Sequence, residues 1–215
     1  MTSVAQSWAV VVPVKRLELA KTRLSVDREL RRELALAMAT DTVLACRGTT
    51  GVVEVVVVTD DEIAGAAMRS LGATVVPDEP DAGLNPALSH GVRLARSRHT
   101  EAAVVLLSSD LPALTPQALA PLLQRSGSVD AGCVADAAGT GTTALTLGPS
   151  SSLLPSFGAG SWRRHVDAGA VDLTTYADPQ LRRDVDTTAD LTEAMALGCG
   201  AATVTVVAAH PALLQ

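Results

Sequence analysis

Aromatic side chains are scarce in this chain of 215 residues: they make up 2% of the sequence, whereas hydrophobic residues make up 47%. The core must therefore be built mainly from Val, Leu and Ala. This composition argues against an aromatic-rich β-sandwich and favours a buried parallel sheet covered by helices. The length fits one domain.

Cysteines are also few. Cys46, Cys133 and Cys199 lie far apart and form no C-x-x-C pair, which argues against a zinc site and against a disulfide framework. We expect buried free thiols. The sequence shows no secretory signal pattern and no apolar stretch long enough to span a bilayer, so we expect a cytoplasmic protein that does not bind membranes.

Lysine and arginine are fewer than aspartate and glutamate, 17 against 23, which gives a net charge of −6 at pH 7. Nonspecific nucleic-acid binding needs a basic face, so we expect no nucleic-acid partner. The sequence contains no G-x-S-x-G, Walker A or H-E-x-x-H motif, which argues against serine hydrolases, P-loop ATPases and zincins. Any phosphate must be bound by local cations, backbone amides or metal ions.

Apolar strands alternate with amphipathic helices along the chain. Strands are expected at residues 8–14, 52–59, 73–76, 102–107, 130–135, 142–147 and 203–207, with short extended pieces at 171–173 and 181–185. Helices are expected at 28–46, 62–71, 85–96, 115–124, 161–168 and 188–197, and a turn at 78–83. The alternation predicts a single α/β domain whose mostly parallel, Rossmann-like sheet is flanked by helices.

Lysine occurs only twice, as Lys15 and Lys21, directly after the first expected strand, with Arg23 close by. A lysine is a compact charge with three rotatable donors, which suits a polyphosphate. Ligands of open α/β sheets bind at the carboxyl ends of the strands, where these residues are expected. The alternative is that the chain simply favours arginine and two lysines remain by chance.

Three carboxylates are candidates for binding a divalent cation. Asp110 follows the strand at 102–107 and is held by Leu-Pro, although it could instead be a cap or turn residue. Asp184 and Asp186 are two residues apart, so on an extended segment both would point to one side and share magnesium. Asp186 could also simply cap the helix that follows.

Two glycine-rich segments, 139–142 and 156–161, are suited to anion binding through backbone amides, although ordinary turns are the alternative. The four histidines show no metal-ligand spacing. Only His165 neighbours a candidate site, and we expect it to be a surface or packing residue.

Taken together, these motifs resemble the guanylyltransferases that act on 2-phospho-L-lactate or phosphoenolpyruvate in the biosynthesis of coenzyme F-420. The matching segments are Val12-Pro13-Val14-Lys15, Ala20-Lys21-Thr22-Arg23-Leu24, Leu84-Asn85, Asp110-Leu111-Pro112, Gly139-Thr140-Gly141-Thr142 and Asp184-Val185-Asp186-Thr187. The resemblance spans nearly the whole chain and is greatest to the actinobacterial phosphoenolpyruvate-using branch. It implies a nucleotidyltransferase fold of the nucleotide-diphospho-sugar transferase type. The looser rhythm of the sequence after Gly148 leaves open an acceptor-binding subdomain from about residue 136 to 185, although no linker is visible.

The resemblance also implies an activity, namely transfer of GMP from GTP to phosphoenolpyruvate with release of pyrophosphate. Its implied catalytic residues are Lys21, Asp110, Asp184 and Asp186, and the three aspartates would bind Mg2+. The implied nucleotide contacts are Lys15, Lys21, Arg23 and Asn85, and the implied phosphoenolpyruvate contacts are Thr142, Gly158 and Ser161. A downstream transferase of the pathway is an allowed partner, and the oligomeric state stays open.

Other functions remain open at this point. The acceptor could be 2-phospho-L-lactate or 3-phosphoglycerate, or the transferred nucleotide could differ. A glycosyltransferase could use Asp184 and Asp186 as its metal-binding pair, and would release a nucleoside diphosphate instead of pyrophosphate. A nucleotide-sensing domain without activity would not need three acidic residues at metal distance.

Overall fold

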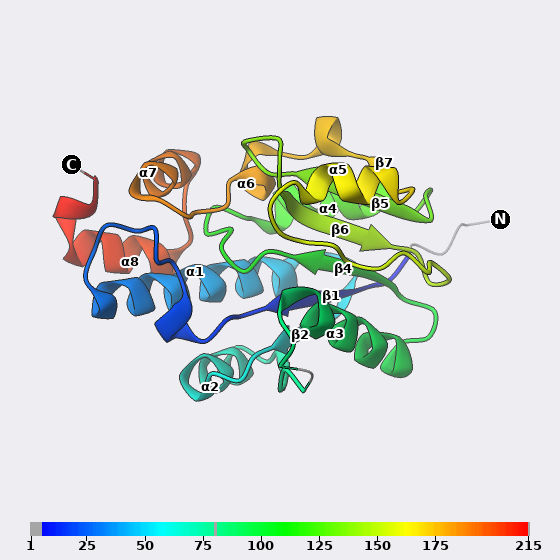
Figure 1. The fold of residues 1–215 in the computed structure, drawn as a ribbon, viewed down its shortest axis with the longest axis horizontal. Helices are drawn as coiled ribbons and strands as arrows, with labels where there is room; N and C mark the ends of the chain where they lie inside the picture. The colour runs from blue at the N-terminus through cyan, green and yellow to red at the C-terminus, as the bar shows by residue number, and fades with distance from the viewer. Residues whose placement is uncertain (1–5, 80, 215) are drawn as a thin grey trace.

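A single seven-stranded sheet forms the centre of the protein (Figure 1), in the order β3-β2-β1-β4-β6-β5-β7. The computed structural model describes residues 6–79 and 81–214. The strands are β1 (Trp8–Pro13), β2 (Val52–Val58), β3 (Thr74–Val76), β4 (Ala103–Leu107), β5 (Ala131–Ala135), β6 (Thr142–Leu147) and β7 (Val171–Asp172). All neighbouring strands pair in parallel except at β6, which is antiparallel to both β4 and β5. The mostly parallel α/β sheet expected from the sequence is confirmed.

Helices cover both faces of the sheet. One face packs against α1 (Arg28–Gly48), α2 (Glu62–Ser70) and α4 (Pro116–Ser126), and the other against α3 (Leu84–Arg98) and α5 (Ser161–Asp167). Strand β1 shows why: Val10 and Val12 belong to the first cluster, whereas Ala9 and Val11 belong to the second, because side chains alternate along a strand. A strand buried on both faces must be apolar throughout, as β1 is.

Helix starts agree with the sequence signals. Asp27 accepts a hydrogen bond from the amide of Leu30 at the start of α1, as expected, and Asp61 caps α2. Helix α3 approaches β1 closely at Gly91, where an added Cβ would lie 2.5 Å from Val11. Of the expected turn at 78–83, Pro80 lies outside the described residues.

The C-terminal region differs from the expectation in two places. Residues 203–207 lie in a helix, α8 (Ala201–Ala209), and not in a strand. The β-branched run suggested a strand, but Asp41 of α1, distant in sequence, accepts hydrogen bonds from the amides of Ala202 (3.0 Å) and Thr203 (2.8 Å) and so caps this helix. The strand propensity of residues 203–207 is outweighed here by a tertiary contact with Asp41.

The second difference concerns residues 181–185, which do not form a strand. A short helix, α6 (Pro179–Arg182), begins at the capping residue Asp178, and an irregular segment follows it. Helix α7 (Thr188–Leu197) then packs with α1 and α8 around a small apolar cluster that includes Leu34 and Val185. Helices α7 and α8 lie at the left end of the molecule in Figure 1, next to α1.

No described helix is long and apolar enough to cross a membrane. The three cysteines are free thiols; Cys46 and Cys133 are buried, and Cys199 is half-buried. Burial raises the pKa of the Cys46 thiol to about 12, so this side chain is an unreactive part of the core.

Candidate active site

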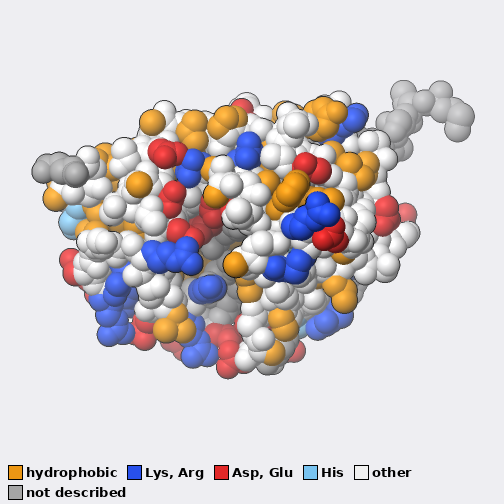
Figure 2. Space-filling view, turned by 45° about the horizontal axis from the view of Figure 1, so that its top comes forward, with side chains coloured by type: hydrophobic (Ala, Val, Ile, Leu, Met, Phe, Trp, Pro, Cys, Tyr) orange, Lys and Arg blue, Asp and Glu red, His pale blue; other side chains and the backbone are white. Residues whose placement is uncertain are grey.

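The candidate site lies where the strand order reverses. From β1 the chain adds β2 and β3 to one side of the sheet, and β4 then pairs with the other side of β1. The carboxyl ends of β1 and β4 therefore meet at a topological switch point, which is where ligands of open α/β sheets bind. A cavity of about 310 Å3 opens there, lined by Lys15, Lys21, Arg23, Asp110 and Asp186. Figure 2 shows a hollowed face on which basic and acidic side chains gather around the depression.

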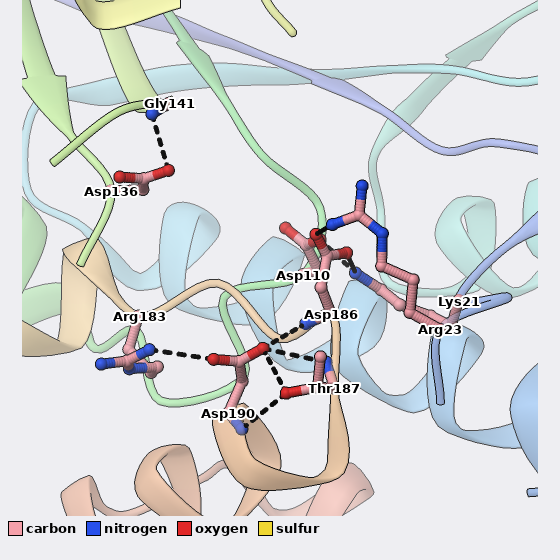
Figure 3. Close-up of polar contacts among 9 residues, drawn as sticks. All are labelled: Lys21, Arg23, Asp110, Asp136, Gly141, Arg183, Asp186, Thr187 and Asp190. Carbon is pink, nitrogen blue, oxygen red and sulfur yellow. Dashed lines mark hydrogen bonds and ion pairs between the residues drawn. The ribbon is translucent and has the colours of Figure 1, made fainter. Parts of the chain in front are cut away.

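Lys21 bridges two of the predicted carboxylates (Figure 3). Its Nζ donates to Asp110 Oδ2 and to Asp186 Oδ1, the latter at 3.2 Å. The Lys21 side chain is only 9% exposed. Burial opposes the charged ammonium, but attraction to Asp110 and Asp186 outweighs it and raises the pKa of Lys21. The ammonium is therefore charged at neutral pH.

The backbone at Lys21 is left-handed, with φ at +55°. A non-glycine residue rarely adopts this conformation, and such strain concentrates at functional sites. The preceding loop is held by Asp61, whose Oδ2 accepts a hydrogen bond from the amide of Leu17 at 2.8 Å. Arg23 lies on the exposed side, with Nη1 3.3 Å from Asp186 Oδ2.

Asp110 is placed by helix α1. Thr42, fully buried in α1, accepts a hydrogen bond from the amide of Leu111 at 3.2 Å, and its hydroxyl proton is shared between the carbonyls of Met38 (2.8 Å) and Ser109 (3.2 Å). These contacts hold the backbone on either side of Asp110. The residue does not cap a helix, since Thr115 caps α4.

Asp184 and Asp186 reach the same place from the far end of the chain. Between them, the amide of Val185 donates to the carbonyl of Asp110 at 3.1 Å, and the Val185 side chain is fully buried. The alternative that Asp186 caps α7 is wrong: Thr187 is the N-cap and forms a capping box with Asp190. The carboxylate of Asp186 is thereby left to Lys21 and Arg23.

Negative charge exceeds positive charge around Lys21. Burial, reinforced by Asp110, Asp136 and Asp186, raises the pKa of Asp184 to about 7. We name this group the acid–lysine cluster: Lys21, Asp110, Asp136, Asp184 and Asp186. Carboxylate oxygens are the ligands that magnesium prefers, and a divalent cation would relieve the repulsion, so these residues fit such an ion.

The three predicted metal ligands are not drawn tightly together in this structure. Among the described residues, the only acidic trio with ligand oxygens within 4.8 Å of one another is Asp60, Asp78 and Asp81. The ammonium of Lys21 lies between Asp110 and Asp186 instead. The metal-binding role of Asp110, Asp184 and Asp186 stays a prediction.

Asp136, at the end of β5, was missed by the sequence analysis. Its carboxylate accepts hydrogen bonds from the amides of Thr140 (2.9 Å) and Gly141 (2.7 Å), the second of which is drawn in Figure 3. Two amides of the glycine-rich segment 139–142 are therefore bound to a side chain of the protein, and binding of a phosphate by this segment stays a prediction. The fact that Asp136 directly precedes the glycine-rich turn was the available signal.

The three residues predicted to contact the acceptor lie around helix α5. The hydroxyls of Thr142 and Ser161 are 3.0 Å apart and both residues are buried, while Gly158 has φ at +119° in the loop before the helix. His165 is also buried, as a packing residue would be. Its Nδ1 lies 3.0 Å from Thr142 Oγ1, and its Nε2 accepts from the amide of Ser156 at 2.9 Å.

These contacts determine which nitrogen of the His165 ring carries the proton, and burial determines its charge. Because Nε2 accepts a hydrogen bond, the neutral ring carries its proton on Nδ1 and donates it to Thr142. Burial, aided by nearby Arg164, lowers the pKa of His165 to about 4. We call Thr142, Ser156, Ser161 and His165 the hydroxyl–histidine network.

Asn85 lies at the edge of the hydroxyl–histidine network, and Lys15 lies at the edge of the acid–lysine cluster. The Asn85 side chain bonds both backbone groups of Phe157, its Oδ1 accepting at 2.6 Å and its Nδ2 donating at 3.1 Å. It thus ties α3 to the loop before α5, and its contact with a nucleotide stays a prediction. Lys15 is exposed and lines the cavity.

The sequence as a whole matches a known family. Residues 8–207 match the family model described as "Guanylyl transferase CofC like". The chain belongs to this family. The match covers nearly the whole described chain, and membership of this family identifies the protein as a transferase.

Individual relatives and solved structures agree with the family. This guanylyl transferase is 48% identical to a phosphoenolpyruvate guanylyltransferase of Thermomonospora curvata, covering 96% of this chain and 91% of the relative. It is 49% identical to one of Streptomyces coelicolor, covering 94% and 96%. A structure described as a nucleotide-diphospho-sugar transferase, from Desulfovibrio desulfuricans, has a TM-score of 0.73 at 17% identity, covering 97% of both chains. That likeness confirms the expected nucleotidyltransferase fold.

Proposed function

We propose that this protein transfers the guanylyl group of GTP to phosphoenolpyruvate, giving enolpyruvyl-diphospho-5'-guanosine and pyrophosphate. The observation that carries the proposal is the position of Lys21 between Asp110 and Asp186 at the switch point of a guanylyl transferase fold. The names of the relatives, each a phosphoenolpyruvate guanylyltransferase, support the choice of acceptor.

The reaction needs no general base. A phosphate oxygen of the acceptor attacks the α-phosphorus of GTP in line, a P–O bond forms, and the bond to the β-phosphate oxygen breaks. A phosphate monoester is already anionic near neutral pH, so catalysis consists of positioning and charge neutralisation. Lys15, Lys21 and Arg23 neutralise the triphosphate and the departing pyrophosphate, since all three line one cavity.

Asp110, Asp184 and Asp186 would hold Mg2+, and the bound ion would supply further charge neutralisation at the phosphates. Binding of the triphosphate would also compete with Asp110 and Asp186 for Lys21. The surroundings of Asp184 support this assignment: burial, and after it the nearby carboxylates of Asp110, Asp136 and Asp186, raise its pKa, and a bound cation would offset both effects.

Thr142, Gly158 and Ser161 would seat the acceptor, within a segment from about residue 136 to 185 that carries most of the acceptor contacts. The hydroxyl–histidine network supports this role: His165 and Ser161 both use Thr142 Oγ1 as an acceptor, which leaves the Thr142 proton to donate to an anion. We place the reaction in the biosynthesis of coenzyme F-420, in the cytoplasm, with a downstream transferase as the consumer of the product.

The test is to incubate the pure protein with GTP, magnesium and each of three acceptors in parallel: phosphoenolpyruvate, 2-phospho-L-lactate and 3-phosphoglycerate. Pyrophosphate and the nucleotide product are measured together. We expect the highest kcat/KM with phosphoenolpyruvate. Turnover only with another acceptor would move the proposal to that acid, and release of a nucleoside diphosphate would point to glycosyl transfer. No turnover with any of the three would refute it.

A further inference from the structure

A second cavity adjoins the acid–lysine cluster. It has a volume of about 260 Å3 and lies beside the carboxyl ends of β1 and β2 and the start of α3. It shares Pro13, Val14 and Lys15 with the cavity that contains Lys21. A ligand with its phosphates at Lys21 could therefore extend its other end into this space.

The walls of this second cavity are largely apolar. Val14, Leu84 and Ala87 line it, and Leu19 lies at its edge with 68% of its surface exposed. An exposed leucine beside a cavity gains free energy when a ligand covers it. Walls of this kind suit a flat, apolar ring better than a hydrated ion.

The polar side of the cavity is acidic. Asp60, Asp78 and Asp81 line it, with carboxylate oxygens within 4.8 Å of one another. Asp60 is already engaged: its Oδ1 accepts from the amide of Asp78 at 3.0 Å, and its Oδ2 lies 3.8 Å from Arg16. Asp81 is exposed to solvent.

Asp78 differs from its two neighbours. Its Oδ1 is shielded from solvent and has no hydrogen-bond partner among the described residues. Burial, with Asp60 and Asp81 nearby, raises the pKa of Asp78. A shielded, unpaired carboxylate oxygen costs free energy that a ligand with N–H donors can recover.

The chemistry of the bases decides which ligand fits. An ionised carboxylate only accepts hydrogen bonds. Guanine presents two adjacent donors, N1–H and N2–H2, which match its two oxygens. Adenine and cytosine pair one amino donor with a ring-nitrogen acceptor, which would face the carboxylate unfavourably, and uracil has one N–H between two carbonyls.

We propose that Asp78 selects guanine by accepting hydrogen bonds from N1–H and N2–H2 of GTP, with the base between Val14, Leu19 and Leu84 and the phosphates at Lys15 and Lys21. Asp60 is a positioning residue that holds the backbone of Asp78. The inference rests on the proposed function only in taking GTP as the nucleotide.

The experiment compares GTP with ITP, which lacks only the 2-amino group. Affinities are measured by calorimetric titration with magnesium and without an acceptor, so the result does not depend on which acid accepts the nucleotide. We expect the wild-type protein to bind GTP about 10- to 100-fold more tightly than ITP, the effect of one hydrogen bond to a charged group. In Asp78→Asn this ratio should fall to about 1.

Asp81→Asn is the matched control, because it removes the same charge from the same trio but should keep the wild-type ratio. Equal loss of both nucleotides in Asp78→Asn and Asp81→Asn would show that the trio acts through charge or a bound cation, and would overturn the proposal. Equal affinity of the wild-type protein for GTP and ITP would overturn it without any variant, whether or not Asp78→Asn folds. Tight GTP binding with no turnover of any acceptor would overturn the proposed function alone.

Discussion

The acid–lysine cluster and the hydroxyl–histidine network are both polar and partly buried, yet they are built in opposite ways. In the first, carboxylates outnumber the cations, and burial together with repulsion from Asp110, Asp136 and Asp186 raises the pKa of Asp184 to about 7. In the second, the contacts among the four members are between neutral groups, and burial, aided by nearby Arg164, keeps His165 uncharged. An unbalanced cluster gains free energy from a charged ligand, whereas a network of neutral groups that bond one another mainly holds a shape. We propose on this basis that the acid–lysine cluster performs the chemistry and that the hydroxyl–histidine network keeps the acceptor loop in place.

The largest effect is expected from Asp110→Asn, which removes a charge from the acid–lysine cluster while keeping its shape. We expect kcat/KM for GTP-dependent pyrophosphate release to fall about 10²- to 10³-fold, because a carboxylate that would hold Mg2+ at the phosphates and that pairs with Lys21 is lost. The melting temperature should change little. Asp130→Asn, at an exposed site outside the cluster, serves as the control and should retain activity. Retained turnover in Asp110→Asn would remove Asp110 from the metal role.

The second effect is on stability, through His165. The unfolded histidine takes up a proton near pH 6.5 but the folded one only near pH 4, so the free energy of unfolding should fall as the pH drops through this window. The loss should reach up to about 3 kcal/mol. Urea unfolding at pH 7 and pH 4.5 measures it. His165→Gln should be less stable at pH 7 but less sensitive to pH, and an unchanged pH dependence would contradict the neutral, buried assignment.

Lys21→Arg should have an intermediate effect. The ammonium fits between two carboxylates with 9% of its side chain exposed, and a larger planar guanidinium cannot occupy the same point. We expect kcat/KM to fall about 10-fold or more, measured by pyrophosphate release. Lys15→Arg, at an exposed position, is the matched comparison and should lose less. Near-normal turnover in Lys21→Arg would mean that lysine at this position is incidental.

The smallest effect is expected from Arg23→Gln. Arg23 is 76% exposed, and its ion pair with Asp186 should contribute no more than about 1 kcal/mol to stability. We expect an unchanged melting temperature and a severalfold higher KM for GTP, with the difference shrinking as salt is added. A KM that does not depend on salt in the wild-type protein would indicate that Arg23 does not contact the phosphates.

Local signals predicted most of the fold, and tertiary contacts account for the errors. Strand β6 and helix α7 have the predicted bounds, because the hydrophobic pattern of a strand and the capping of a helix depend on neighbouring residues. Residues 203–207 are β-branched and were predicted as a strand. They form a helix because Asp41, buried in α1, caps it. No local pattern could reveal a partner about 160 residues away.

In the candidate active site, too, local signals predicted some residues and tertiary contacts decided the others. Lys21 and Asp110 were found because each follows a recognisable strand, and Asp186 because of its spacing to Asp184, although the extended piece expected there is absent; the structure brings the three into contact. Asp136 was missed because its role depends on the fold around it: its carboxylate bonds the turn that follows it and adds to the charge around Asp184.

The sequence by itself determined the α/β class, the family and the residues from which a phosphate site could be built, because hydrophobic periodicity and the order of motifs are local properties of the chain. Only the tertiary structure decided that Lys21 is shared between Asp110 and Asp186, that Thr187 and not Asp186 caps α7, and that Thr142 and Ser161 belong to a network with His165. Charge balance and burial depend on which distant segments meet, and these are the quantities that set each group's pKa and its ability to bind a ligand.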